Sequence, residues 1–257
     1  MSSINDQLVQ LYRSHWDGFL AEASRLENSA VKSACPLMIQ VDEDKYKSAA
    51  LRVMYVGQET RGWGTPGTKS MIEHMERYRK YFLEGNYLRN SKKSVFWRAV
   101  KDFDHLFSKR FGSGNVASVW NNVAKIGLRD KRGMNEDVRN LGHQFFPVFS
   151  REVEILAPDV IVFMTGPDRD RDILHHFPNA KIGRAVEGIP RRQLAAIDFL
   201  NFSAVAIRTY HPRYFGGFNR VLADAKAVLE QKLVPIYALR CPDPVTKPSG
   251  SFDVVDL

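Results

Sequence analysis

The sequence is poor in cysteine, and this excludes several kinds of site and scaffold. Its 257 residues include two cysteines, Cys35 and Cys241, which lie far apart along the chain. A disulfide scaffold, a four-cysteine zinc site and a four-cysteine iron–sulfur cluster all need more thiols than this. We therefore expect a protein of a reducing compartment, with no metal in its functional site.

Long apolar runs and nucleotide-binding loops are absent as well. No stretch approaches the ~20 apolar residues of a membrane-spanning helix, and the polar N-terminal segment does not resemble a signal peptide. The GWG and GSG segments lack the spacing of a dinucleotide-binding loop, and no GxxxxGK[ST] motif occurs. We expect a cytoplasmic protein that has no cofactor and no membrane partner.

Positive charge and apolar residues are, by contrast, plentiful. Lysine and arginine number 37 against 29 acidic residues, which gives a formal net charge of +8. Such an excess favours an anionic partner, of which nucleic acid is one. Hydrophobic residues make up 44% of the chain, enough for a folded core.

The pattern of apolar residues predicts the fold class. Short apolar runs predict buried strands at 51–56, 116–126, 159–166 and 203–209. Apolar residues at helical spacing predict helices in the first 30 residues and at 69–88, 94–107, 138–156, 168–177 and 218–233. Strands that alternate with helices pair in parallel, so we expect an α/β fold, a three-layer α/β/α sandwich around a central four-stranded parallel sheet.

One domain accounts for most of the chain under this prediction. It comprises residues 1–240 and carries a helical insertion at about 65–115. Residues 241–257 are rich in Pro, Ser and Gly and are expected to form a flexible C-terminal tail.

Polar motifs follow three of the predicted strands. GQET comes after the first strand, Asn121 and Asn122 lie within or at the end of the second, and YHPRYF follows the fourth. The carboxyl ends of parallel strands share one edge of the sheet, which is where such folds bind ligands. We therefore expect the three motifs to converge on one site.

Together these segments resemble the uracil-DNA glycosylase superfamily from about Val53 to Leu229. VGQETRGWG and TYHPRYF are similar to its first and second motifs, and EILAPDVIVFMTG to a shared helix–Pro–strand–Gly segment. WNNVAKIG resembles the base-reading strand of the thermostable iron–sulfur branch. The chain differs from that branch in its missing cluster cysteines, in the long segment before Asn122, and in Thr60, where many relatives have proline.

The resemblance implies a monofunctional DNA glycosylase that flips out and hydrolyses uracil or a related deaminated base. We expect it to act on DNA as a monomer, without a cofactor. One alternative is a non-catalytic relative that binds nucleic acid or a free base through the same pocket. Another is an α/β hydrolase of small nucleoside-like molecules.

Two residues are candidates for catalysis. Cleavage of an N-glycosidic bond builds positive charge on the sugar and negative charge on the leaving base, so an anion and a hydrogen-bond donor are needed. Glu59 is the candidate anion and water activator, unless it caps its loop or pairs with Arg61. His211 is the candidate donor to the leaving base, with Pro212 fixing the backbone after it; the alternative is a structural histidine.

Four residues are candidates for binding the base. Asn122 offers both a donor and an acceptor to the edge of a pyrimidine, and Asn121 takes this role if the register differs by one. Trp63 either stacks on the base or packs on the core. Gly57 and Gln58 are expected to line the pocket with backbone, since glycine permits close approach.

The remaining candidates contact DNA. Arg213, Tyr214 and Phe215 follow His-Pro, where the resemblance implies a loop that wedges into the duplex; the alternative is that both aromatic residues belong to the core. Basic residues suited to phosphate contact are Arg191, Arg192, Lys125, Lys69, Arg129, Lys131 and Arg132.

Overall fold

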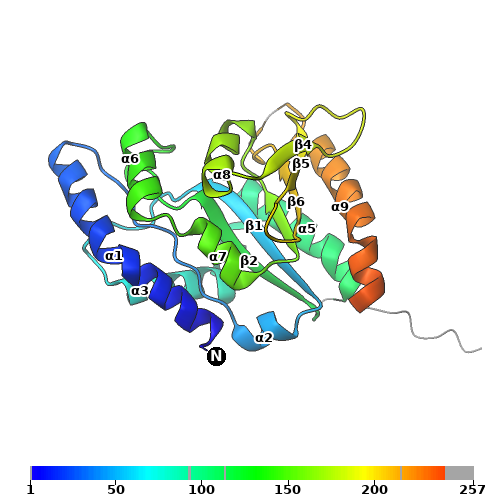
Figure 1. The fold of residues 1–257 in the computed structure, drawn as a ribbon, viewed down its shortest axis with the longest axis horizontal. Coiled ribbons are helices and arrows are strands. Elements are labelled where there is room, and N and C mark those ends of the chain that lie inside the picture. Colours follow the sequence, from blue (N-terminus) through cyan, green and yellow to red (C-terminus); the bar gives the residue numbers. More distant parts are fainter. Residues whose placement is uncertain (1, 92–93, 113, 215, 241–257) are drawn as a thin grey trace, which may run out of the picture.

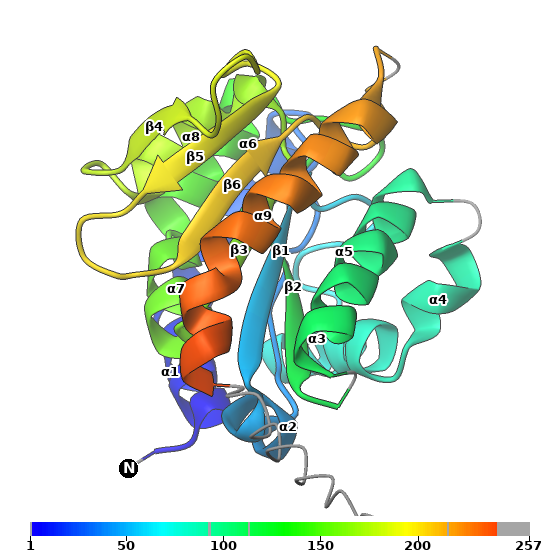
Figure 2. The same ribbon diagram turned by 90° about the vertical axis from the view of Figure 1, so that its right-hand side faces the viewer.

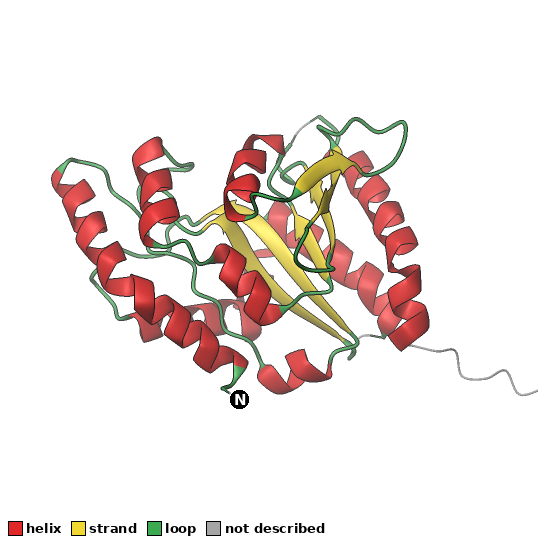
Figure 3. Cartoon of the chain, in the orientation of Figure 1, coloured by secondary structure: helices red, strands yellow, loops and turns green. Residues whose placement is uncertain are grey.

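A mixed sheet of six strands forms the centre of the molecule (Figures 1 and 3). The computed structural model describes residues 2–91, 94–112, 114–214 and 216–240. The strands lie in the order β2–β1–β3–β6–β5–β4. Their bounds are β1 Leu51–Glu59, β2 Val116–Ala124, β3 Val160–Phe163, β4 Lys181–Arg184, β5 Leu194–Asp198 and β6 Val205–Thr209.

The predicted α/β class is confirmed, but the predicted strand number is wrong. β2, β1, β3 and β6 are mutually parallel and correspond to the four apolar runs of the sequence. β5 and β4 extend this sheet in antiparallel orientation. They escaped prediction because edge β4 is partly exposed, with the sequence KIGR, and β5 is short, with two alanines.

Helices cover both faces of the sheet. Figure 2 shows α5 (Val95–Phe111) and α9 (Phe218–Arg240) on one face, with α1 (Ile4–Asn28) and α7 (Phe149–Leu156) on the other. The helix predicted in the first 30 residues is therefore confirmed as α1. Ser3 begins it, because its hydroxyl accepts from the backbone N–H of Asp6 in a capping box.

The helix predicted at 69–88 is interrupted. It consists of α3 (Met71–Tyr78), the π-helical η1 (Arg79–Leu83) and α4 (Asn86–Ser91). Gly85 separates η1 from α4 with a φ of +73°, a conformation that side chains disfavour. Together with α5, these elements make the segment at 65–115 helical, as predicted.

The helix predicted at 138–156 is also interrupted. Its first part is α6 (Glu136–Asn140) followed by the π-helical η2 (Leu141–Phe145), and its second part is α7. The first part ends at Phe145, shortly before Pro147, consistent with the restriction that proline places on the residue before it. The shorter helical elements are α2 (Glu43–Ser48), η3 (Pro167–Arg169) and α8 (Asp170–His176).

The end of α9 is fixed to the base of the sheet. Arg240 donates to the carbonyl of Ala50 and to the carboxylate of Asp159, both at 2.8 Å. The tail predicted at 241–257 lies outside the described residues. Within the described ranges, no helix is both long and apolar enough to cross a membrane.

Candidate functional site

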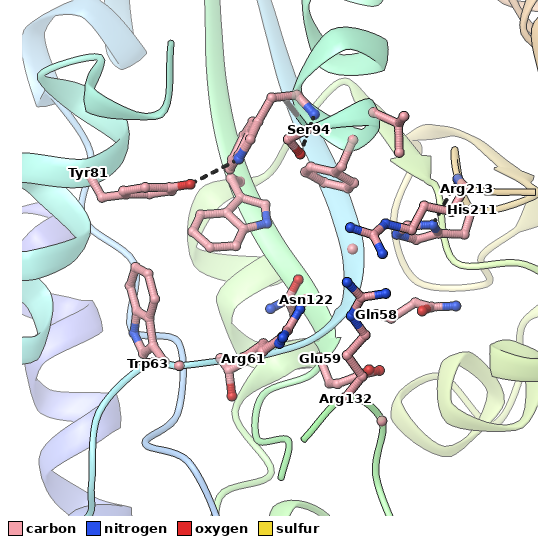
Figure 4. Close-up of a pocket in the computed structure, with 18 of the residues that line it drawn as sticks. Gln58, Glu59, Arg61, Trp63, Tyr81, Ser94, Asn122, Arg132, His211 and Arg213 are labelled. Atoms are coloured by element: carbon pink, nitrogen blue, oxygen red, sulfur yellow. Dashed lines mark hydrogen bonds between the residues drawn. The ribbon is translucent and has the colours of Figure 1, made fainter. Parts of the chain in front are cut away.

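A cavity of about 1020 Å³ lies at the carboxyl ends of the parallel strands. The end of β1, the end of β2 and the loop after β6 all contribute to it, and the helical segment at 65–115 adds Tyr81, Phe96 and Trp97. Figure 4 shows Tyr81 on one side of the cavity and His211 on the other. The predicted convergence of the three motifs is therefore confirmed. Residues of the predicted site that line the cavity are Gly57, Gln58, Glu59, Trp63, Asn122, His211 and Arg213.

Asn122 is the polar group at the centre of the β1–β2 edge. It pairs in register with Gly57 on β1, and its side chain is 2% exposed. A Cβ on Gly57 would lie 2.5 Å from Asn122 Oδ1, so only glycine lets the amide lie across β1. Among the described residues, none accepts a hydrogen bond from Asn122 Nδ2.

Asn121 belongs to the opposite face of the sheet, which settles the choice between the two asparagines. Its Nδ2 donates to Glu152 Oε2 at 2.9 Å, and its Oδ1 accepts from Lys125 Nζ at 2.7 Å. Successive side chains of a strand point to opposite faces. Asn122 is therefore the asparagine of the cavity, and Asn121 is a structural residue.

The prediction that Lys125 contacts DNA is wrong. Its ammonium lies 2.8 and 2.9 Å from the two carboxylate oxygens of Glu152, and the side chains are 1% and 0% exposed. Tyr12 adds a hydrogen bond of 2.6 Å to the same carboxylate. Burial lowers the pKa of Lys125 and raises the pKa of Tyr12 well above its usual value. A lysine in this position cannot reach a phosphate.

Glu59 forms an ion pair that the sequence did not indicate. Arg169 Nη2, from η3, donates to Glu59 Oε2 at 2.5 Å, and the side chains are 13% and 12% exposed. Arg61, the partner considered from the sequence, makes no ion pair with any described carboxylate. Gly127 packs close to this loop, because a Cβ there would lie 2.2 Å from the carbonyl oxygen of Thr60. Glu59 thus lines the cavity as a paired carboxylate.

His211 is held in one neutral form. The backbone N–H of Arg213 donates to His211 Nδ1 at 3.1 Å, so the proton of the neutral ring is on Nε2. Burial first, and the charge of Arg213 second, lower the pKa of His211 to about 4. The ring stacks beside Phe96 with a centroid distance of 6.3 Å. At neutral pH, His211 is therefore an uncharged donor on the cavity wall.

Trp63 packs within an aromatic cluster. Its indole is 6% exposed and makes edge contacts with Tyr81 and Trp120 at centroid distances of 5.8 and 5.4 Å. The guanidinium of Arg77 lies 4.7 Å from the centroid of its ring. These contacts favour the packed alternative, although Trp63 still lines the cavity.

Phe96 is a cavity residue that sequence reasoning missed. A Cβ on Gly57 would lie 3.4 Å from a ring carbon of Phe96, so this ring faces the same glycine as Asn122 does. The signal for it was the Phe96-Trp97 pair near the start of a helix. The sequence alone does not connect this pair with the strand motifs, because only the folded chain places α5 beside them.

Gln58 lines the cavity, and its side chain is held in a hydrogen bond. Its Nε2 donates to the carbonyl of Thr165 at 2.7 Å. This hydrogen bond ties the end of β1 to the end of β3. The amide of Gln58 thus fixes the edge of the sheet on which the cavity is built.

Of the other predicted DNA contacts, Arg132 lines the cavity, whereas Tyr214, Arg191 and Arg192 do not. Tyr214 stacks on Tyr210 at 3.9 Å and is 38% exposed, and Phe215 lies outside the described residues. Arg191 donates to the carbonyl of Ile182 at 3.3 Å, and the exposed Arg192 lies 3.7 Å from Asp168. Both arginines precede β5, on a part of the chain that does not line the cavity.

Positive charge dominates the lining. One lining residue, Glu59, is acidic, whereas the basic residues are Arg61, Arg77, Lys80, Arg132, Arg169 and Arg213. This carboxylate, the one acidic group among the described lining residues, is already paired with Arg169. The arrangement therefore favours an anionic or acceptor-rich ligand.

Metal ligands do not gather in the described part of the chain, where no group of three or more His, Cys, Asp and Glu side chains could hold an ion. No family model matches the sequence, and no curated protein matches it either. The resemblance to the uracil-DNA glycosylase superfamily thus remains a prediction from the motifs.

Proposed function

We propose that the cavity binds a nucleobase that has left the base stack, and that the protein is a DNA glycosylase acting on uracil or a related deaminated base. The observation that carries the proposal is the buried amide of Asn122, whose Nδ2 has no acceptor among the described residues. It faces the same cavity as the neutral donor His211. A buried donor without a partner costs about 1–3 kcal/mol, and a ligand carbonyl would remove that cost.

The other unpaired groups of the cavity are also donors. Trp63 Nε1 and Trp120 Nε1 are buried, and neither has a partner among the described residues. The Nε1 of Trp97 differs, because it donates to Tyr81 Oη at 3.0 Å. A lining with three unpaired donors suits a ligand rich in carbonyl oxygens, and deaminated bases carry more of these than the amino bases from which they form.

The chemistry of base release fits the two candidate catalytic residues. The leaving base gains negative charge. The neutral ring of His211 can donate its Nε2–H to that base without first taking up a proton. The sugar gains positive charge, which the Glu59 carboxylate would stabilise while it positions a water molecule. Phe96 offers an apolar ring against which the base can stack.

A second candidate function is base binding without cleavage, and the Glu59–Arg169 pair favours it. Glu59 Oε2 already accepts a hydrogen bond from Arg169 Nη2 at 2.5 Å, so this oxygen is engaged by the guanidinium and less available to position a water molecule. In this alternative, Asn122 and His211 recognise the base and no bond is broken.

Oligonucleotides that contain uracil, hypoxanthine or xanthine distinguish the two functions. A glycosylase leaves abasic sites, detected as alkali-induced strand breaks, in single or double strands. We expect His211→Ala and Glu59→Gln to lower the single-turnover rate by at least about 100-fold. Arg171→Gln is the matched control, because Arg171 pairs with Glu136 on the surface and does not line the cavity.

Binding measurements on the same oligonucleotides complete the test. If no abasic site forms, but a deaminated base tightens binding in wild type and not in Asn122→Ala, the binding function is correct. If the protein neither releases a deaminated base from the oligonucleotides nor binds them more tightly because of it, both candidate functions are wrong.

A further inference from the structure

Three loops each bring an exposed arginine to the same cavity. Arg61 follows β1, Arg132 follows β2 and Arg213 follows β6, and all three residues line the cavity. Figure 4 shows their side chains around the opening that also contains Asn122 and His211. We call these residues the arginine triad.

The charge of the arginine triad is not balanced within the described structure. None of its members lies within ion-pair distance of a described carboxylate. Other arginines of the chain differ: Arg169 pairs with Glu59, and Arg208 pairs with Asp170 at 2.9 Å.

Arg132 is repelled electrostatically by the other two members of the triad. The charge of Arg213 first, and that of Arg61 second, lowers the pKa of Arg132, which indicates that Arg132 lies within range of both charges. Like charges held together without a counter-ion destabilise a fold, and an anion bound between them relieves the repulsion. Guanidinium groups suit phosphate best, since their paired N–H groups match its oxygens.

The cavity also has more volume than a base needs. Its volume of about 1020 Å³ lies at the upper end of the range for ligand sites, roughly 300–1,000 Å³. The unpaired amide of Asn122 and the ring of Phe96 lie next to Gly57, whereas the arginine triad is exposed to solvent. Space therefore remains for a sugar and a phosphate between the base pocket and the triad.

We propose that Arg61, Arg132 and Arg213 form a phosphate-binding site at the mouth of the base pocket, so that the ligand is a nucleotide unit and not a free base or nucleoside. This inference rests on the proposed function for the identity of the base, and on the triad alone for the phosphate. The phosphate belongs either to a free nucleoside monophosphate or to a nucleic-acid backbone.

Binding of four probes tests the proposal: deoxyuridine, deoxyuridine 5′-monophosphate, deoxyribose 5-phosphate and a short single-stranded oligonucleotide with one deoxyuridine. Each is titrated into wild type, Arg132→Gln and Arg61→Gln. Arg171→Gln is the matched control, because Arg171 pairs with Glu136 on the surface and does not line the cavity. Thermal unfolding shows whether each variant is folded.

We expect each triad variant to bind a phosphorylated probe at least about tenfold more weakly, with deoxyuridine binding and the control unchanged. The logarithmic salt dependence of oligonucleotide binding should become shallower by about one per arginine removed. Binding of the monophosphate assigns the site to free nucleotides, and binding of the oligonucleotide alone assigns it to a nucleic-acid backbone.

The proposal is overturned if folded triad variants bind every phosphorylated probe as Arg171→Gln does. Arg132→Lys provides a further check, because it keeps the charge and loses the paired geometry; we expect it to recover binding only in part. If wild type binds deoxyribose 5-phosphate as tightly as the nucleotide, the phosphate site stands and the base pocket of the proposed function is wrong.

Discussion

Replacing Lys125 with methionine should destabilise the protein strongly, because it leaves a carboxylate without its counter-ion in the core. Methionine preserves most of the length and volume of the side chain. Glu152 is 0% exposed and would keep two neutral donors, Tyr12 at 2.6 Å and Asn121 at 2.9 Å. Removing one partner of a buried ion pair costs about 3–5 kcal/mol, and we expect a loss in that range.

A surface ion pair of similar geometry supplies the control. Lys47 Nζ lies 2.6 Å from Glu43 Oε2, but its side chain is 56% exposed. Solvent screens such a pair, so Lys47→Met should cost far less stability than Lys125→Met. The comparison isolates burial, because the nitrogen–oxygen distances of the two pairs differ by little.

Urea denaturation followed by tryptophan fluorescence measures both losses. Trp120 lies next to Asn121 in β2 and should report the unfolding of this region. The double variant Lys125→Met/Glu152→Gln removes the unpaired charge, and we expect it to be more stable than Lys125→Met by about 2 kcal/mol. A loss for Lys125→Met no larger than that for Lys47→Met would refute the reasoning. The reasoning would also be refuted if Lys125→Met had the stability of wild type and a weaker salt dependence of DNA binding, because that result is expected of a lysine that contacts phosphate.

Two further predictions concern the cavity. Gly57→Ala places a Cβ 2.5 Å from Asn122 Oδ1, so it should displace the amide and abolish nucleotide binding in titrations. It should also lower the free energy of unfolding by about 1–3 kcal/mol, because the site is overpacked. Gly183→Ala is the control: a Cβ there would have nothing within 4 Å, so nucleotide binding and stability should stay unchanged. The pKa of His211 is lowered from 6.5 to about 4 in the folded protein, so the unfolded chain binds more protons between these values, and stability should fall as the pH decreases from 6.5 to 4. Equilibrium unfolding across this range should show a shallower fall for His211→Gln; equal slopes for both proteins would contradict the assigned environment of the ring.

The sequence was sufficient to predict the parallel strands and the edge where they end. Strands buried on both faces are continuous apolar runs, such as 159–166, and polar motifs after them mark the ligand edge of the sheet. Gly57 and Asn122 could be placed together on this basis, because adjacent parallel strands end at the same edge. β4 carried no such signal, since an edge strand with exposed side chains resembles a loop.

Pairing over long sequence separations could not be predicted. Lys125 was expected at the surface because an isolated lysine is rarely buried. It directly follows β2, and its partner Glu152 lies 27 residues later, on α7. In the same way, Arg169 comes 110 residues after Glu59 and joins it only through the turn that follows β3. Charged residues were predicted one at a time, whereas their burial depends on pairs that the fold creates.

The two asparagines of β2 show how hydrogen bonding separates a structural residue from a functional one. Asn121 and Asn122 are both buried and adjacent in sequence, so neither burial nor position distinguishes them. Every polar atom of the Asn121 side chain has a partner in the network with Lys125 and Glu152. The Nδ2 of Asn122 has none among the described residues, although an unpaired buried donor destabilises the fold. The chain thus satisfies one amide completely and leaves a buried donor without a described partner on its neighbour, a residue that lines the cavity; this difference in hydrogen bonding supports the proposal that a ligand of the cavity binds Asn122.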